Sequence, residues 1–402
     1  MAQSEINVMS CGHVDHGKTT IIGSITGKNT DTHSEEVKRG ITIKLGYADV
    51  VVRKCDKCGT FTLKEKCEKC ILPTKESRRI SFLDAPGHET LMATVVAASS
   101  IVDGALFIIA ANEKCPQPQT LEHMLVLDAI GIKKVIIVQT KVDLVTKEQA
   151  QQNYKEIKEL VKGTGLENAP IIPVSAVTNT NIDRLIQAIN ATIPTPKRDE
   201  SADPLFFVAR SFDVNLPGSE ISKINGGVLG GSIVHGSLKE GDEIEILPGY
   251  ITVKKERESY NPIRTTVANL NANGKVGEAH PGGLVGIATM LDPALTRADA
   301  LAGSVVGKPG TLPPVLHEVE LKVKPIKRQS VAFADTFVEN EPLVLGIGTA
   351  TTVGFVLGKS KKNKSAYRLS LKKPVCGKAG NVVALLRRAG NRWHFYGTAE
   401  IV

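Results

Sequence analysis

The chain has 402 residues and a formal net charge of +8; 42% of its residues are hydrophobic and 23% are charged. This length exceeds what a single hydrophobic core usually supports, so we expect two or three domains of an ordinary globular protein. No apolar run approaches the length of a membrane span and no secretory leader pattern opens the sequence, so we expect no membrane contact and a cytoplasmic location. The positive charge is compatible with an RNA partner, although many soluble proteins are mildly basic without one.

The first half of the chain alternates apolar runs with helix-like segments. We predict buried strands at residues 6–11, 80–83, 104–110, 134–139 and 171–174. The helical patterns around and between them span residues 19–25, 88–100, 117–130, 147–162 and 182–193. Such alternation is typical of a mostly parallel sheet covered on both faces, in which ligands bind at the carboxyl ends of the strands.

The second half has almost no helical pattern. A Pro-containing segment at residues 194–199 is typical of a linker, and a Pro-rich one at 309–314 predicts a second boundary. The short alternating stretches are 205–212, 243–247, 342–347 and 381–386, with Gly and Pro turns such as 216–218 and 248–249 between strands. This spacing is typical of small β-barrels. We therefore predict an α/β domain at residues 1–198 and two β-barrel domains at 199–312 and 313–402.

Residues 12–19 read Gly-His-Val-Asp-His-Gly-Lys-Thr, a full match to the phosphate-binding loop pattern G-x-x-x-x-G-K-[ST]. Gly12 and Gly17 allow the tight backbone whose N–H groups face phosphate oxygens. Lys18 supplies a positive charge to the β- and γ-phosphates, and the Thr19 hydroxyl is a ligand for Mg²⁺. Because a predicted strand precedes the loop and a predicted helix follows it, we predict a nucleoside triphosphate site here.

Two further segments are placed to respond to the γ-phosphate. Asp84 ends a predicted strand, where its carboxylate can bind Mg²⁺ through a water molecule. The Gly87 N–H can donate a hydrogen bond to the γ-phosphate. Thr42, in the segment 39–43, is placed to close over Mg²⁺ when the γ-phosphate is present and to release it after hydrolysis. These residues predict a site that switches with the bound nucleotide.

Base selectivity is expected at residues 140–143 (Thr-Lys-Val-Asp), directly after a predicted strand. The Asp143 carboxylate can accept both N1–H and N2–H₂ of guanine, and charge-assisted bonds of this kind contribute roughly 1.5–3 kcal/mol each. Residues 175–177 follow the next strand, where backbone N–H groups can reach the guanine O6. The residues that we expect at the base are Thr140, Lys141, Asp143, Ser175, Ala176 and Val177. The ordered set of motifs predicts a P-loop GTPase domain.

Four of the seven cysteines form two C-x-x-C pairs separated by eight residues. The pairs are Cys55 with Cys58 and Cys67 with Cys70. In a reducing compartment this pattern indicates a metal site, because two such turns present four thiolates tetrahedrally to Zn²⁺. We predict a zinc knuckle at residues 55–70, with an oxidised or metal-free loop as the alternative. The other cysteines, Cys11, Cys115 and Cys376, lack ligand spacing and are expected to be packing residues.

Taken together, these motifs resemble the translational GTPases, the group that includes elongation factor Tu. Residues 12–20, 39–43 and 84–88 match the signatures of this group nearly letter for letter. The stretches that look like the γ subunit of archaeal and eukaryotic translation initiation factor 2 are 42–48, 210–215, 226–233, 280–285 and 291–293. The resemblance therefore extends over the whole chain.

The resemblance implies a GTP-dependent carrier of initiator methionyl-tRNA to the small ribosomal subunit, which hydrolyses GTP to release the tRNA. It implies a heterotrimer with α and β subunits, and an aminoacyl end held between the GTPase domain and the first barrel. Val14 and Ile41 would form an apolar gate near the attacking water, and His88 would position that water. The nucleotide contacts that it adds are Asp15, His16 and Thr20, and it places Asp15 and Gly40 near Mg²⁺.

One position departs from the family pattern, which has Asn-Lys-x-Asp where this chain has Thr at position 140. The family's Asn ties the base-binding loop to the phosphate loop and reaches guanine N7. Thr140 keeps a hydroxyl, but its side chain is shorter than that of Asn and has one fewer polar group. Since one neutral hydrogen bond contributes about 1 kcal/mol, we expect guanine selectivity to persist with a several-fold lower nucleotide affinity.

A positively charged run lies in the third domain. It comprises Lys359, Lys361, Lys362 and Lys364, with Arg387, Arg388 and Arg392 further along. This run is compatible with contact to RNA phosphates and equally with a solvated loop that keeps the protein soluble.

Two other functions stay open on the sequence. The first is another aminoacyl-tRNA-carrying GTPase, of the selenocysteine-specific elongation factor type. The second is a non-hydrolysing RNA-binding scaffold subunit with a decayed GTPase domain, for which Thr140 is the only sign.

Overall fold

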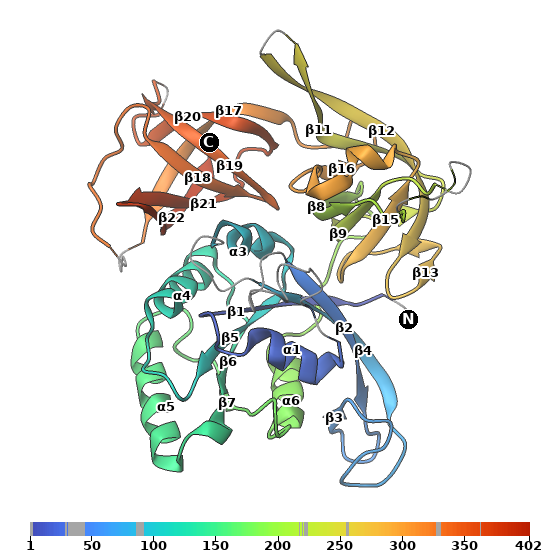
Figure 1. The fold of residues 1–402 in the computed structure, drawn as a ribbon, viewed down its shortest axis with the longest axis vertical. Helices are drawn as coiled ribbons and strands as arrows, with labels where there is room; N and C mark the ends of the chain where they lie inside the picture. Colours follow the sequence, from blue (N-terminus) through green and yellow to red (C-terminus); the bar gives the residue numbers. More distant parts are fainter. Residues whose placement is uncertain are drawn as a thin grey trace.

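Three lobes make up the computed structural model: an α/β domain at one end of the molecule and two β-barrels that lie above it (Figure 1). The structure describes residues 3–28, 30, 45–85, 92–216, 218, 220, 224–254, 257–326, 331–361 and 363–402. In these residues no helix is long and apolar enough to cross a membrane.

The sheet of the α/β domain has seven strands in the order β3-β2-β4-β1-β5-β6-β7. Their bounds are β1 Ile6–Gly12, β2 Gly46–Lys54, β3 Phe61–Thr62, β4 Lys75–Asp84, β5 Gly104–Ala110, β6 Val135–Thr140 and β7 Ile171–Pro173. The strands from β4 to β7 run parallel, whereas β2 is antiparallel to β4 and β3 to β2. The prediction of a mostly parallel sheet is confirmed, and β2 and β3 are an antiparallel edge that the apolar runs did not indicate.

Helices cover both faces of this sheet. They are α1 Lys18–Thr26, α3 Met92–Ala98, α4 Pro118–Ile130, α5 Lys147–Val161 and α6 Ile182–Thr192. Because side chains alternate along a buried strand, β5 contributes to a hydrophobic core on each face of the sheet. Phe107 packs with α3, α4 and α5, and Ile108 packs with α1 and α6. The predicted helix at 88–100 is described only from Met92, and a 3₁₀ turn at Ser99–Ile101 follows it.

The first barrel is a ring of six strands in the order β11-β16-β8-β9-β15-β12, closed by pairing of β11 with β12. Its strands are β8 Leu205–Phe212, β9 Val228–His235, β11 Glu243–Lys254, β12 Arg257–Asn271, β15 Val285–Thr289 and β16 Val305–Gly307. Three two-residue strands, β10 Leu238–Lys239, β13 Lys275–Val276 and β14 Glu278–Ala279, lie beside the ring. The turn predicted at residues 248–249 is wrong: β11 continues through it, with a register shift between Ile246 and Tyr250. A β-bulge absorbs the Pro-Gly pair without ending the strand.

The second barrel is a closed ring of six strands in the order β17-β20-β19-β18-β21-β22. Its strands are β17 Val315–Pro325, β18 Pro342–Ile347, β19 Ala350–Lys359, β20 Ala366–Cys376, β21 Val382–Ala389 and β22 Arg392–Ile401. The predicted architecture of one α/β domain and two β-barrels is therefore confirmed.

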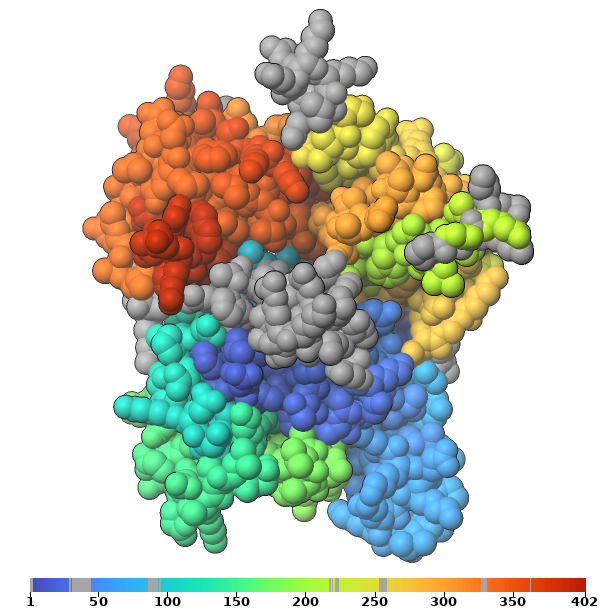
Figure 2. Space-filling view, viewed as in Figure 1, coloured from blue at the N-terminus to red at the C-terminus, as the bar shows by residue number. Residues whose placement is uncertain are grey.

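Both barrels are packed against the α/β domain, as the space-filling view also indicates (Figure 2). Val344 and Phe395 of the second barrel belong to the same hydrophobic core as α3 and α4. The first barrel is joined to β1 through Asn7, whose Nδ2 donates to Ser232 Oγ at 3.1 Å and to Gly283 O at 3.2 Å. The first barrel also lies beside the amino-terminal half of β2, where Gly46 pairs with Asp84 of the predicted nucleotide site.

Candidate functional site

The phosphate loop connects β1 to α1 at the carboxyl edge of the sheet. Gly12 has φ +144°, and a Cβ there would lie 2.2 Å from the Ile108 carbonyl oxygen of β5. Gly17 caps α1 with φ +86°, also in the left-handed region. Both glycines are therefore required by close approach or by backbone conformation, and the N-terminus of α1 opens into the loop.

Lys18 is buried, with its amine directed back over the loop. Its Nζ donates to the carbonyl oxygens of Gly12 at 3.1 Å and His13 at 2.8 Å. A buried ammonium group beside the loop attracts an anion, so Lys18 fits the phosphate role predicted for it.

The Asp84 carboxylate, at the end of β4, is fully buried and accepts three hydroxyl groups. Ser10 donates to its Oδ1 at 2.7 Å, and Thr19 and Thr30 each donate to its Oδ2 at 2.6 Å. The structure thus brings together two of the predicted Mg²⁺ residues, Thr19 and Asp84. Oxygen ligands of this kind suit Mg²⁺, so the donor set fits that cation. The sequence did not indicate Ser10 or Thr30, because no motif marks a hydroxyl 74 or 54 residues from its partner.

His16 turns its ring into the protein and away from the loop mouth. Its Nδ1 lies 3.2 Å from the Ile108 carbonyl oxygen and its Nε2 lies 3.3 Å from Glu113 Oε2. Burial lowers the pKa of the ring from 6.5 to about 4, so the imidazole is neutral at pH 7. A neutral ring bonded to a carbonyl must carry its proton on Nδ1, which leaves the backbone of His16, not its side chain, to face a phosphate.

The remaining loop residues face outward. Asp15 is exposed at φ +61°, the half-buried Val14 precedes it, and Thr20 is exposed in the first turn of α1. The structure leaves Val14 and Asp15 at the open side of the loop, where their predicted roles as gate residue and cation contact stay predictions.

Thr140 ends β6 beside the phosphate loop. Its Oγ1 donates to the His16 carbonyl oxygen at 2.6 Å. The link between the base-binding loop and the phosphate loop, which we expected Thr140 to make less well than Asn, is therefore present in this structure. The lower nucleotide affinity predicted for Thr140 then has to come from the lost contact to guanine N7.

The other base residues follow β6 and β7, which are neighbouring parallel strands. Lys141 has φ +58° and Asp143 is exposed in the 3₁₀ turn Val142–Leu144. Ser175 is buried, and its N–H already donates to the Thr180 carbonyl oxygen at 3.2 Å. Val177 is largely exposed beyond it. The two segments meet at one edge of the sheet, as a base site requires.

Five predicted site residues lie outside the described part of the chain. They are Gly40, Ile41, Thr42, Gly87 and His88.

The four cysteines of the predicted knuckle gather at one point beside β3. All four sulfur atoms lie within 4.8 Å of one another, and Cys58 Sγ is 3.6 Å from Cys67 Sγ. Tetrahedral Zn²⁺ with bonds of about 2.3 Å would separate its sulfur ligands by about 3.8 Å, so the cluster fits zinc. Hydrogen bonding with Thr60 lowers the pKa of the Cys58 thiol to about 6, while neighbouring Cys58 raises that of Cys70 to about 12. Four thiols this close favour a cation that replaces the shared protons.

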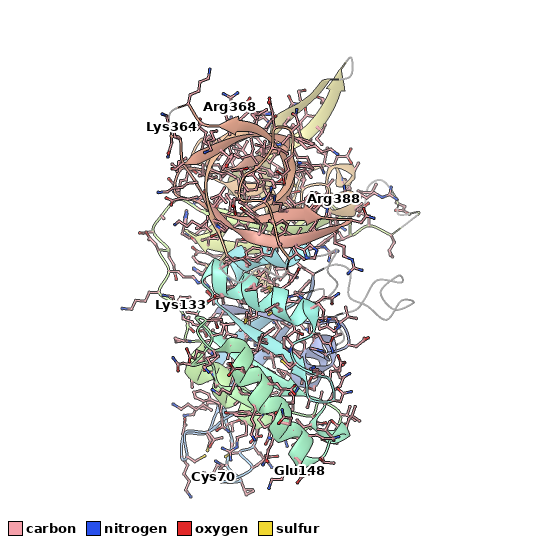
Figure 3. All side chains as sticks on the ribbon, turned by 90° about the vertical axis from the view of Figure 1, so that its left-hand side faces the viewer. Cys70, Lys133, Glu148, Lys364, Arg368 and Arg388 are labelled. Carbon is pink, nitrogen blue, oxygen red and sulfur yellow. The ribbon has the colours of Figure 1, made fainter. Side chains whose placement is uncertain are left out.

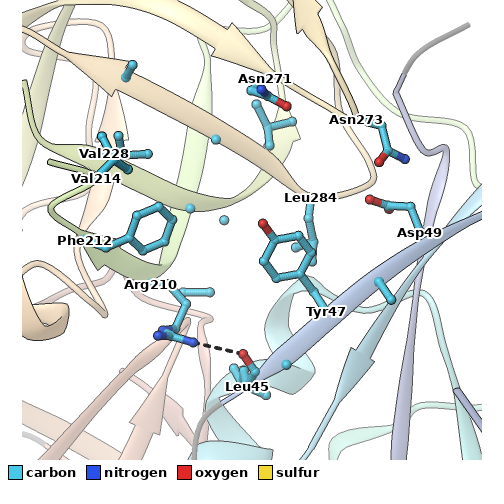
Figure 4. Close-up of a pocket in the computed structure, with 18 of the residues that line it drawn as sticks. Leu45, Tyr47, Asp49, Arg210, Phe212, Val214, Val228, Asn271, Asn273 and Leu284 are labelled. Atoms are coloured by element: carbon cyan, nitrogen blue, oxygen red, sulfur yellow. Dashed lines mark hydrogen bonds between the residues drawn. The ribbon is translucent and has the colours of Figure 1, made fainter. Parts of the chain in front are cut away.

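A cavity of about 470 Å³ lies between β2 and the first barrel. Tyr47 of β2 projects into it, with Phe212 of β8 on the opposite wall and Asn271 and Asn273 above (Figure 4). Arg210 Nη1 donates to the Leu45 carbonyl oxygen at 3.1 Å across the domain boundary. Its walls come from segments more than 150 residues apart, and it lies between the GTPase domain and the first barrel, where the resemblance implies that the aminoacyl end is held.

The positively charged residues of the second barrel do not form one surface. Arg387 is only 5% exposed and forms an ion pair with Glu341 at 2.6 Å, so it fits neither the RNA contact nor the solvated loop that the sequence left open. Lys359, Lys361 and Lys364 are exposed, and Lys362 lies outside the described residues.

Three family models match the chain in succession. The Elongation factor Tu GTP binding domain matches residues 3–195, Elongation factor Tu domain 2 matches 226–307, and Initiation factor eIF2 gamma, C terminal matches 317–401. The three matches follow the three lobes of the fold.

Whole-chain relatives agree with these models. Translation initiation factor 2 subunit gamma of Methanocaldococcus jannaschii is 50% identical, covering 99% of this chain and 98% of the relative. The protein of the same name from Pyrococcus abyssi is 51% identical, covering 98% and 97%.

Solved structures of other translation factors have the same fold. A bacterial selenocysteine-specific elongation factor, EF-Sec, superposes with a TM-score of 0.73 at 26% identity, covering 99% of this chain and 58% of that one. Elongation factor SelB from Methanococcus maripaludis, in complex with the GTP analogue GppNHp, gives a TM-score of 0.73 at 25% identity, covering 100% and 79%. GTP, GDP and Mg²⁺ are the ligands expected of such a GTPase domain. The chain belongs to the family of translation initiation factor 2 γ subunits, and it is a translational GTPase that acts as a GTP-dependent initiation factor.

Proposed function

We propose that the chain carries initiator methionyl-tRNA to the small ribosomal subunit in its GTP-bound form and releases it after hydrolysis. The observation that carries the proposal is the cavity between β2 and the first barrel. Its volume of about 470 Å³ lies in the range of small-ligand sites, and its walls combine two aromatic rings, amides and aliphatic groups. That chemistry suits the terminal adenosine and the aminoacyl group of a charged tRNA.

The cavity is connected to the nucleotide site through β2. Leu45 and Tyr47 stand at the start of this strand, three and five residues after Thr42, and Gly46 pairs with Asp84 in the sheet. A change in the Mg²⁺ environment of Asp84 therefore has a short covalent and hydrogen-bonded path to the cavity wall. This proximity supports coupling between nucleotide and tRNA.

For the nucleotide we propose the following contacts. Lys18 pairs with the β- and γ-phosphates, and Thr19 and Asp84 hold Mg²⁺, which neutralises phosphate charge when bound. Asp143 accepts from guanine N1–H and N2–H₂. Because the Ser175 N–H is already used, the guanine O6 accepts from Ala176. Lys141 and Val177 flank the base, and the backbone of His16 and the Thr20 turn complete the phosphate cradle.

For hydrolysis we propose the roles that the sequence motifs indicate. His88 positions the attacking water and Val14 with Ile41 controls access to it. Thr42 and Gly40 close over Mg²⁺, and Gly87 donates to the γ-phosphate. These assignments rest on the match of residues 39–43 and 84–88 to the family signatures.

We also propose the organisation around this activity. Domain boundaries lie after residues 198 and 312, within the segments that join the three lobes. Cys55, Cys58, Cys67 and Cys70 hold a structural Zn²⁺. The partners are initiator tRNA, the small ribosomal subunit, and the α and β subunits of the same factor, acting in the cytoplasm.

The test is the affinity for methionyl initiator tRNA with a non-hydrolysable GTP analogue and with GDP, each with and without the α subunit. We expect tighter binding with the analogue. Tyr47→Ala, which removes the ring from the cavity, should weaken tRNA binding without changing GDP affinity. Equal tRNA affinity in both nucleotide states contradicts the proposal.

Carriage of selenocysteyl-tRNA is a second candidate, favoured by the fold that the chain shares with a solved selenocysteine-specific elongation factor. Against it, the whole-chain identity to initiation factors is about twice the identity to this structure. Competition between the two charged tRNAs for the GTP-bound protein decides between them.

A further inference from the structure

The cysteine knuckle is built from two turns with the same hydrogen-bond pattern. In the first turn the Gly59 N–H donates to the Cys55 carbonyl oxygen at 2.8 Å; in the second the Ile71 N–H donates to that of Cys67 at 2.7 Å. The return bonds also match, from Cys55 N to Thr60 O at 3.0 Å and from Cys67 N to Leu72 O at 2.8 Å. Gly59 and Ile71 therefore occupy equivalent positions.

Both positions require a left-handed backbone, with φ +69° at Gly59 and +57° at Ile71. Glycine adopts this conformation freely because it has no Cβ. A β-branched residue is an outlier there, since its side chain crowds the main chain. The first turn uses the residue that the geometry favours, and the second uses one of the least suited.

Burial does not compensate for this conformation. Ile71 is 72% exposed and the adjacent Leu72 is 43% exposed. Neither the turn nor the protein core explains an isoleucine at position 71, whereas an external contact would. Strained residues that carry exposed apolar side chains are typical of binding surfaces.

Lysines surround this apolar tip. Lys57 and Lys69 hold the same place in the two turns, and Lys66 pairs through its backbone with Pro73, next to Leu72. Within the described residues these three lysines form no ion pair. By contrast, Lys64 is paired with Glu68 and Lys75 with Asp56. Glu65, next to Lys66, also forms no ion pair among the described residues, so three lysines and one carboxylate stay unpaired and the net charge around the tip is positive.

The knuckle extends from the end of the molecule opposite the barrels. Cys70 lies at one end, and Lys364 and Arg368 lie at the other (Figure 3). Phe61 and Leu63 anchor the knuckle against the core formed with α1 and α6. Its tip thus lies away from the cavity assigned to tRNA.

We propose that this tip, formed by Ile71 and Leu72 with Lys57, Lys66 and Lys69, docks an acidic protein segment that offers an apolar contact. An apolar centre with a charged rim is the usual anatomy of protein interfaces. Sequence-specific recognition of unpaired RNA bases instead relies on aromatic or guanidinium stacking. The aromatic ring nearest the tip in sequence, Phe61, is packed inward beneath Lys54, whose Nζ lies 5.5 Å from the ring centre.

The experiment places the photo-cross-linker p-benzoylphenylalanine at position 72 of the full chain, produced in its native cells. We expect a cross-linked protein whose attached peptide is rich in Asp and Glu. The product should be lost when Lys57, Lys66 and Lys69 are changed together to Glu. The same linker at Val382, which is 58% exposed on the second barrel, should not capture that protein.

A second measurement combines Ile71→Gly with the same p-benzoylphenylalanine at position 72. Because Gly59 already occupies the equivalent position, this variant should keep its zinc and melt at a higher temperature, yet lose the cross-linked product. Cross-linking to RNA, no product, or a product unaffected by both the Glu and Gly changes would overturn the proposal.

Discussion

The Thr140 hydroxyl donates to the main-chain carbonyl of His16 at 2.6 Å, which fastens the end of β6 to the phosphate loop. Both groups are buried, so this bond is shielded from water. The base-binding and phosphate-binding segments are therefore one connected unit even though position 140 lacks the family's asparagine.

Substitutions at position 140 can distinguish the contribution of the hydrogen bond to His16 from that of a contact to the base. Thr140→Val keeps the shape but removes the hydroxyl, so a buried carbonyl loses its partner at a cost of about 1–3 kcal/mol. We expect GDP and GTP affinity to fall about tenfold or more, measured with fluorescent nucleotides. Thr140→Ser, which keeps the hydroxyl, is the control and should stay close to the parent.

Thr140→Asn tests the missing contact to the base. An amide at this position restores the second polar group, so nucleotide affinity should rise several-fold, equivalent to about 1 kcal/mol. Unchanged dissociation constants for GDP and GTP would show that reach to the base is not limiting.

His16 makes the stability of the α/β domain depend on pH. Its pKa is about 4 in the folded protein and 6.5 as the ordinary value, with burial as the main cause. Between these pH values the unfolded state binds the additional proton, so stability falls as pH decreases from 6.5 toward 4, by up to about 3 kcal/mol. Calorimetry of nucleotide-free protein measures this slope. His16→Gln, which cannot titrate, should flatten it; an unchanged slope would assign the pH dependence to other groups.

Thr30 donates to an oxygen of the Asp84 carboxylate that a metal-bound water would also use. Its hydroxyl donates to the same oxygen, Oδ2, that accepts from Thr19. If a metal-bound water takes this oxygen, Thr30→Val removes a competitor and should strengthen Mg²⁺ retention by up to about tenfold, since bonds to charged groups contribute about 1.5–3 kcal/mol. The Mg²⁺ dependence of GDP release measures this effect.

Thr26→Val is the matched control for that experiment, because its hydroxyl bonds to Ile22 O inside α1 at 2.8 Å. It should leave Mg²⁺ retention unchanged. Weaker retention in Thr30→Val would mean instead that Thr30 helps to hold the metal shell.

The sequence indicates the parts of this fold whose signals are local. The parallel strands are continuous apolar runs because helices cover both faces of the sheet. Strand β2 has only a short apolar run, residues 50–52, and is largely half-exposed near the edge of the sheet. The Pro-Gly pair after Leu247 has the composition of a turn, but the long β11–β12 pairing overrides that local preference.

The same limit applies to the functional site. The glycines, Lys18 and Asp84 belong to motifs and could be located by spacing alone. Ser10 and Thr30 could not, because their common partner is distant in sequence and their own neighbours are ordinary. The cavity at Tyr47 required the placement of the first barrel, which depends on tertiary contacts such as those of Asn7.

The knuckle should hold zinc independently of the nucleotide site. We expect about one zinc ion per purified chain by elemental analysis, and a large loss in Cys58→Ser because three thiolates remain. GDP affinity should not change, since the cluster adjoins the edge strand β3 and contributes no residue to the phosphate loop. Cys376→Ala, outside the cluster, should retain zinc. A full zinc content in Cys58→Ser would contradict a four-cysteine site.

Substitution of Arg387 should affect the stability of the second barrel, whereas substitution of its exposed lysines should not. The Arg387 guanidinium is bonded to Glu341 and lies 4.7 Å from the ring centre of Phe337. Removing it in Arg387→Met leaves a largely buried carboxylate without its partner, so the second barrel should lose about 3 kcal/mol of stability. Exposed Arg388→Met should change stability by less than about 0.5 kcal/mol.

The triple change of Lys359, Lys361 and Lys364 to Ala should leave the stability of the protein unchanged and affect only its binding to RNA. If these lysines contact phosphates, the slope of log affinity against log salt for tRNA or the small ribosomal subunit falls by about 0.7–0.9 for each lost contact. Arg387→Met should not alter that slope, because its charge is already neutralised inside the barrel. An unchanged slope in the lysine variant would assign the run to a solvated loop, the alternative that its exposure equally allows.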